Sequence, residues 1–180
     1  MRYLKIVGVL AAIGLVGFLV DLNHGRALGI GDGSMTIGVP VPAGKPVEVY
    51  YLAPSPSRNN SGNPITLVSA QPGTADPGLE FVEARIYQVD AFPNGDPPLS
   101  WTASNGSAWD PAARPSVPLA GYVLAEHYDL SAQVILARFR VTTDQRPLQA
   151  SDFRLTYRNG FRDHTQTLHC VFRVEPPVTD

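Results

Sequence analysis

The region between Gln133 and Val174 constrains the fold of this chain more than any other stretch, because apolar and polar residues alternate along most of its length. Phe153, Leu155 and Tyr157 alternate with polar residues, so a period of two places these three side chains on one face of a strand. Asn159–Gly160 follows at once and tolerates the positive φ angles of a two-residue hairpin turn. We therefore predict three antiparallel strands here, each with one buried face.

The chain after residue 30 has the composition of a protein built from strands and turns. Over the whole chain, 17 Pro and 16 Gly make up nearly a fifth of the 180 residues, which is typical of many short strands joined by turns. Further strands are expected over Val47–Ala53, Ile65–Ala70 and Leu79–Asp90, and alternation in the last places Val82 inward and Tyr87 outward. We predict one all-β domain, an antiparallel β-sandwich of about seven strands, preceded by one N-terminal hydrophobic helix.

The core of this sandwich is predicted from the inward-facing positions of its strands. It comprises Val49, Leu67, Val82, Ile86, Ile135, Phe139, Leu155, Leu168, Cys170 and Phe172. Cys170 is the single cysteine, so an intramolecular disulfide is excluded and the domain must be held together by this core. We interpret the thiol as a small buried hydrophobe.

The N-terminus reads as an export signal. Two cations, Arg2 and Lys5, precede the apolar run Ile6–Val20, which is short for a membrane-spanning helix. It predicts either an uncleaved signal-anchor or a signal cleaved after Ala27, and both place the domain outside the cytoplasm. The expected organisation is a signal segment over 1–27, a glycine-rich flexible tether over 28–34 and the sandwich over 35–180. The predicted location is the cell membrane, with secretion after cleavage as the alternative.

Several functional classes find no support in the sequence. A net charge of −2 predicts no general attraction to nucleic acid. No signature of a nucleophile elbow, a phosphate-cradling loop or a dinucleotide site occurs, so we predict no enzymatic activity and no cofactor. His164 and His169 are an odd number of residues apart and would point to opposite faces of one strand, so no metal site is predicted.

Residues 91–118 form the longest stretch without clear periodicity, and this length predicts a functional loop. The stretch holds six prolines with Trp101 and Trp109. The tryptophans have two interpretations: anchors tucked over one end of the core, or an exposed aromatic platform that could stack on a ligand.

A surplus of arginine marks the C-terminal third, where residues 138–173 contain seven Arg and three Asp. Five of the arginines take outward positions in the predicted strands: Arg138, Arg140, Arg154, Arg158 and Arg173. They form either an ordinary solvated sheet face or a face that contacts phospholipid head groups, a cell-wall polyanion or an acidic partner.

The order of these features resembles a family of uncharacterised membrane-anchored proteins of actinobacteria. The resemblance covers residues 64–174 and lies in the hydrophobic pattern, the entry Pro118–Leu119–Ala120–Gly121–Tyr122 and the closing run ILARFRV…DFRLTYRNG. It implies an immunoglobulin-like extracytoplasmic domain and no known activity.

Together these features predict a non-enzymatic, membrane-tethered interaction or structural domain. Its contact with an envelope protein or cell-wall polymer would use the Trp101/Trp109 loop or the arginine face. The alternative is a protein of the cell envelope that binds a small ligand, either a glycan or a metal.

Overall fold

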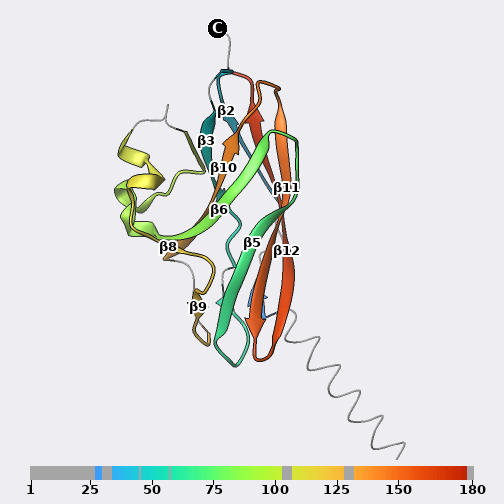
Figure 1. Ribbon diagram of the computed structural model, residues 1–180. Helices are drawn as coiled ribbons and strands as arrows, with labels where there is room; N and C mark the ends of the chain where they lie inside the picture. The colour runs from blue at the N-terminus through green and yellow to red at the C-terminus, as the bar shows by residue number, and fades with distance from the viewer. Residues whose placement is uncertain are drawn as a thin grey trace, which may run out of the picture.

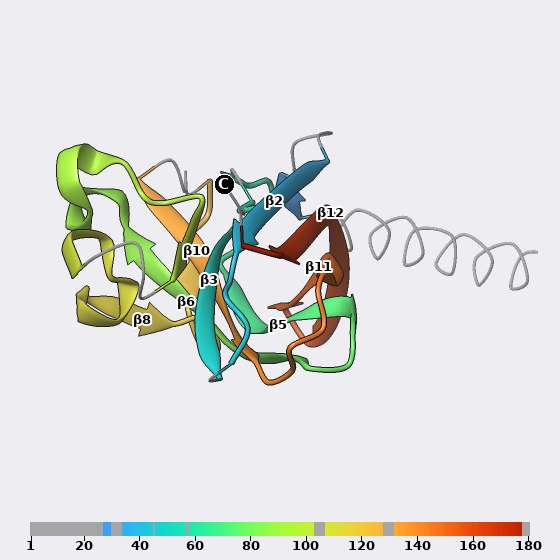
Figure 2. The same ribbon diagram turned by 90° about the horizontal axis from the view of Figure 1, so that it is seen from above.

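The computed structural model describes residues 27–29, 34–44, 46–56, 58–102, 107–127 and 132–177. Within these ranges the chain is an all-β sandwich of two five-stranded sheets, with a separate two-stranded ribbon (Figures 1 and 2). No helix in the described ranges is long and apolar enough to cross a membrane. The predicted N-terminal helix and Ile6–Val20 lie outside them.

The strands in the described ranges are joined by turns and loops, as the composition predicts. They are β1 (Leu28–Gly29), β2 (Met35–Pro40), β3 (Val47–Ala53), β4 (Arg58–Asn59), β5 (Ile65–Ala75), β6 (Leu79–Gln88), β7 (Ser100–Thr102), β8 (Ser116–Pro118), β9 (Val123–Leu124), β10 (Gln133–Val141), β11 (Leu148–Asn159) and β12 (Arg162–Glu175). One sheet has the order β7-β3-β10-β6-β8 and the other β2-β12-β11-β5-β9. Seven of these described strands have six residues or more, and they form the body of the sandwich.

The three strands predicted between Gln133 and Val174 are present as β10, β11 and β12. Their inward side chains are buried as the alternation predicts, including Phe153, Leu155 and Tyr157. Strand β10, however, lies in the other sheet from β11 and β12, so the chain crosses between layers after Val141. The β11–β12 turn is also one residue later than predicted, because Asn159 pairs with Arg162 and leaves Gly160–Phe161 as the connection.

The core between the sheets centres on a cluster of aromatic rings. The ring of Phe172 lies 5.1 Å from that of Tyr51, 5.7 Å from that of Phe139 and 6.3 Å from that of Phe153. Burial of each such side chain contributes about 1.5–3 kcal/mol, and favourable ring geometry adds about 0.5–1.5 kcal/mol per pair. The two sheets are therefore joined mainly by side chains from β3, β10, β11 and β12.

Nine of the ten predicted core residues are buried, and Val82 is the exception with 36% of its surface exposed. Its strand contains a β-bulge: Glu83 pairs with Arg138 while Phe81 pairs with Phe139, so Val82 is an extra residue with no partner on β10. A bulge reverses the inside–outside alternation on one side of it. Phe81 packs against the core in place of Val82.

The start of the predicted tether is docked on the sandwich. Strand β1 pairs antiparallel with β4, and Leu28 is held by two hydrogen bonds to the Gln166 side chain. Ala27 and Leu28 are 1% and 3% exposed, so they pack against the domain, while the flexible tether over 28–34 stays a prediction. The segment 30–33 lies outside the described ranges.

The single cysteine has the environment predicted for a buried hydrophobe. Cys170 is a free thiol buried in the core. Burial, with a smaller contribution from the nearby Asp152 carboxylate, raises its pKa to about 12. A thiol with this pKa is almost entirely protonated at neutral pH and is a poor nucleophile and metal ligand.

Candidate functional site

The long loop over residues 91–118 crosses the outer face of one sheet. Its short strand β7 pairs with β3 at one edge of that sheet, and β8 pairs with β6 at the opposite edge. The short 3-10 helices η1 (Val89–Ala91), η2 (Pro93–Gly95), η4 (Ser107–Trp109) and η5 (Pro111–Ala113) belong to the same excursion. Figure 2 shows this part of the chain on the side of its sheet that faces away from the other sheet. The described parts of the loop are therefore fixed at both ends.

A second apolar cluster lies between this loop and the sheet. Its buried members are Tyr50, Tyr87, Phe92, Trp101 and Leu136, with Leu52, Val134 and Trp109 packed against them. The Trp101 ring meets that of Tyr50 edge-on at 5.7 Å, and Tyr87 and Phe92 lie 5.7 Å apart. Tyr87 thus points away from the main core, as its position in the strand predicts, and is nevertheless buried because the loop covers it.

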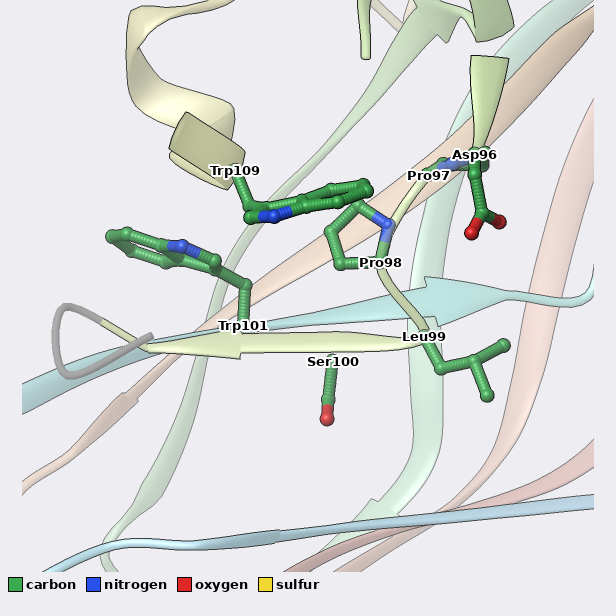
Figure 3. Close-up of a pocket in the computed structure, with 7 residues that line it drawn as sticks. All are labelled: Asp96, Pro97, Pro98, Leu99, Ser100, Trp101 and Trp109. Carbon is green, nitrogen blue, oxygen red and sulfur yellow. The ribbon is translucent and has the colours of Figure 1, made fainter. Parts of the chain in front are cut away.

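An open hollow of about 630 Å³ lies on this loop. Its lining comprises Asp96, Pro97, Pro98, Leu99, Ser100, Trp101 and Trp109, and we call it the tryptophan groove. Both indole rings lie on one side of β7, while the Ser100 side chain points to the other (Figure 3). Leu99 is 61% exposed and Trp109 is half-buried. The groove therefore presents proline, leucine and indole surfaces beside a nearly equal share of polar surface.

The two tryptophans have different roles in this groove. Trp101 is only 7% exposed, so it is an anchor, as one interpretation of the sequence predicted. It is anchored on the outer face of a sheet, however, and not over one end of the main core. Trp109 is half-buried and forms a wall of the groove, so only one partly accessible indole supports the interpretation as an aromatic platform.

Backbone contacts hold the groove in place. The Leu52 N–H donates to the Leu99 carbonyl at 2.8 Å, which continues the β3–β7 pairing by one residue. Asn94 and Gly95 turn the chain before the prolines with φ angles of 59° and 68°. On the far side, the Asp110 carboxylate accepts from the Ala112 N–H at 2.9 Å and caps η5. Because these anchors order both sides of the groove, it is preformed.

A second hollow, of about 450 Å³, lies between the loop and the same sheet and is mostly polar. Arg85 closes one side of it by donating to the Ser116 hydroxyl at 2.8 Å and to the Ser116 carbonyl at 3.2 Å. These bonds join β8 to β6. Because Glu83 is already paired with Arg85 and Arg138, this hollow stabilises the loop and is a weaker candidate for ligand binding than the tryptophan groove.

The five outward arginines do not form the single face that the sequence predicted. Arg138 and Arg140 lie on β10, whereas Arg154 and Arg158 lie on β11 and Arg173 on β12. These strands belong to opposite sheets, so the arginines are divided between the two outer faces of the sandwich. The prediction failed because alternation shows which side chains point outward but does not show which sheet a strand joins.

Four of these arginines have acidic neighbours. Arg138 contacts Glu83 at 2.7 Å and Glu48 at 3.2 Å, and Arg140 contacts Glu48 at 3.3 Å. On the other face, the pairs are Arg158–Asp163 at 2.8 Å and Arg173–Glu175 at 3.5 Å. Pairing neutralises much of the arginine surplus, and this favours the interpretation as solvated sheet faces.

The three histidines within the described ranges lie apart from one another. His127 contacts Glu126 at 3.2 Å, and His169 contacts Asp152 at 3.0 Å. The His164 ring stacks on Tyr157 with the ring centres 5.7 Å apart. Over the described ranges, no group of three or more His, Cys, Asp or Glu side chains is placed to hold a metal ion.

Sequence reasoning found the tryptophans of the groove but missed Pro97, Pro98 and Leu99. The signal was present in the run Asp96–Pro97–Pro98–Leu99–Ser100, because consecutive prolines favour an extended chain. A leucine that follows such prolines in a polar loop is a candidate for an exposed contact residue. No protein-family model matches the chain, and no curated protein sequence matches it.

Proposed function

We propose that this protein is a membrane-tethered, extracytoplasmic interaction domain without enzymatic activity, and that the tryptophan groove contacts its partner. The observation that carries the proposal is the preformed groove of about 630 Å³ with Trp101, Trp109, Pro98 and Leu99 in its lining. Preformed apolar hollows with few polar groups are the usual form of binding sites. The tether is the apolar run Ile6–Val20.

The strand order supports an immunoglobulin-like sandwich as the scaffold of this domain. Counted along the chain, the seven longer strands form one layer in the order 1-7-6-3 and another in the order 2-5-4. This resembles the immunoglobulin arrangement, in which the B, E and D strands face the C, F and G strands. The first longer strand, β2, runs parallel to the last, β12. Such scaffolds carry many functions, so the groove and not the fold supports the proposed function.

The chemistry of the groove favours an uncharged, apolar segment of an envelope protein as the partner. Exposed Leu99, two prolines and an accessible Trp109 edge match aliphatic or proline-rich peptide surfaces. A glycan would require hydroxyl-binding groups beside the indole faces, yet the Asp96 and Ser100 side chains point away from both indoles in Figure 3. We therefore prefer a protein partner to a cell-wall sugar.

Site-specific photocrosslinking in the native envelope tests the proposal. A photoreactive amino acid at Leu99 is expected to give a discrete crosslinked adduct, and the adduct should disappear when Trp109→Ala is added. The matched control places the same group at Arg154, which is exposed on the opposite sheet. Equal crosslinking from both positions, or none from Leu99 in a folded protein, would contradict the groove as the contact surface.

A further inference from the structure

The hairpin between β11 and β12 carries a fully exposed aromatic side chain at its tip. Asn159 and Arg162 form the last pair of the two strands, so Gly160 and Phe161 make the turn. Gly160 has a φ of 62°, a conformation that glycine adopts without strain. Phe161 has a relative exposure of 105%, which means that its ring packs against no other part of the domain.

The N-terminal end of the described chain enters the sandwich beside this hairpin. The Leu28 N–H donates to the Gln166 side-chain oxygen at 3.1 Å, and the Ala27 N–H donates to the Tyr157 hydroxyl at 3.1 Å. Gln166 pairs with Leu155, so Tyr157 lies two residues nearer the hairpin tip. The chain read backwards from Leu28 to Ala27 therefore advances toward the tip that carries Phe161.

This direction is fixed by further contacts of β1. The Asn60 N–H donates to the Ala27 carbonyl at 2.7 Å, and Leu28 pairs with Asn59. The described chain therefore begins, at Ala27, toward the same end as the hairpin tip, which is the lower end in Figure 1.

Chain length then limits how far a membrane could lie from this end. Six residues lie between Val20, the last residue of the apolar run, and Ala27, and the chain from Val20 to Ala27 can span at most about 25 Å. The hairpin tip lies about 13 Å beyond Tyr157, given about 3.3 Å per strand residue. The opposite end of β11, at Leu148, lies about 30 Å from Tyr157 in the other direction. A bilayer that holds Ile6–Val20 would therefore face the Phe161 end.

The side chains around Phe161 suit a lipid surface. Arg158 and Arg162 flank the tip. Asp163 faces Arg158 and pairs with it at 2.8 Å. Val123, 56% exposed, is on the same end, because Thr66 pairs with both Val123 and Arg158. Aromatic rings gather at the level of lipid head groups.

We propose that the β11–β12 hairpin tip is a second membrane contact, in which Phe161 enters the interfacial layer of the bilayer. The contact sets the domain upright on the membrane with its strands along the bilayer normal. This inference rests on the membrane tether of the proposed function. It does not depend on what binds the tryptophan groove.

The full chain reconstituted into vesicles of phosphatidylcholine and phosphatidylglycerol provides the test. In a Cys170→Ala background, an environment-sensitive fluorophore is attached to Phe161→Cys or, as the matched control, to Gln145→Cys. Gln145 is exposed in the connection between β10 and β11, at the opposite end of the sandwich. The expected result is blue-shifted emission and quenching by nitroxide-labelled lipids at position 161, with water-like emission and no quenching at position 145.

Vesicle flotation separates failure of this inference from failure of the tether. If the chain floats with the vesicles but position 161 behaves like position 145, the hairpin contact is wrong while the tether stands. If the chain does not float, the tether fails and the inference fails with it. Phe161 makes no contact that folding requires, and circular dichroism of each labelled chain verifies that the β-sandwich is intact.

Discussion

The two outer faces of the sandwich show how one alternating pattern can serve opposite purposes. On the β7-β3-β10-β6-β8 sheet, the outward positions Tyr50, Tyr87 and Leu136 are apolar and buried beneath the loop. On the other sheet, the outward positions of β11 include Arg154, Thr156 and Arg158, and they face water. Apolar residues on both faces of a strand therefore indicate that a third layer covers the outer face, and here that layer is a loop.

Removal of the Trp101 side chain, which anchors the loop, should have the largest effect on stability. We expect Trp101→Ala to lower the free energy of unfolding by about 3–5 kcal/mol, because it empties a buried site between loop and sheet. The matched change on the open face is Thr156→Ala, which removes a 3.0 Å hydroxyl contact with Thr165 and should cost about 1 kcal/mol or less. Urea denaturation measures both values. Similar losses of unfolding free energy for the two variants would contradict the conclusion that one face is covered and the other is open.

The next largest difference in stability is expected when charged groups on the two faces are neutralised. Glu83 lies between Arg138 at 2.7 Å and Arg85 at 3.3 Å beside the covering loop. We expect Glu83→Gln to cost about 1 kcal/mol, because partly shielded ion pairs in a network retain some of their strength. Asp163→Asn breaks the exposed pair with Arg158 and should leave stability unchanged. Chemical denaturation of both variants at low and high salt would decide the matter, and a larger loss for Asp163→Asn would reverse the contrast.

The covered tyrosines give the smallest predicted effect, at alkaline pH. Burial raises the pKa of Tyr87 in the folded protein, and a hydrogen bond with Ser116 opposes the shift only in part. Because the folded pKa exceeds the unfolded value of about 10, stability from the neutral phenol is present below about pH 10 and is lost as pH rises through the folded pKa.

Thermal unfolding between pH 8 and pH 11 measures this loss. Tyr87→Phe should be less stable than the wild-type protein at pH 8, since it loses the Ser116 hydrogen bond, but its stability should fall less steeply with pH. An identical pH slope for the variant and the wild-type protein would show that the loop does not shield this ring.

The sequence predicted the sandwich and most of its core because period-two alternation reports directly on burial. It did not predict the β-bulge at Val82, since an extra residue in one strand leaves no local mark in the alternation of its neighbours. The division of the arginines also escaped prediction, because sheet membership depends on long-range pairing of β10 with β3 and β6. The groove was half predicted: Trp101 and Trp109 stood out by type, whereas their unequal exposure depends on tertiary packing.

The central claim is that the partner binds the covered face through apolar contacts, and the salt dependence of partner capture tests it most directly. Capture from the native envelope is compared at low and high ionic strength for the wild-type protein, Leu99→Ser with Trp109→Ala, and Arg154→Ala with Arg158→Ala. We predict capture that is insensitive to salt, retained by the arginine variant and lost by the groove variant. Capture that falls steeply with salt, survives the groove changes and is lost with the arginines would contradict the account.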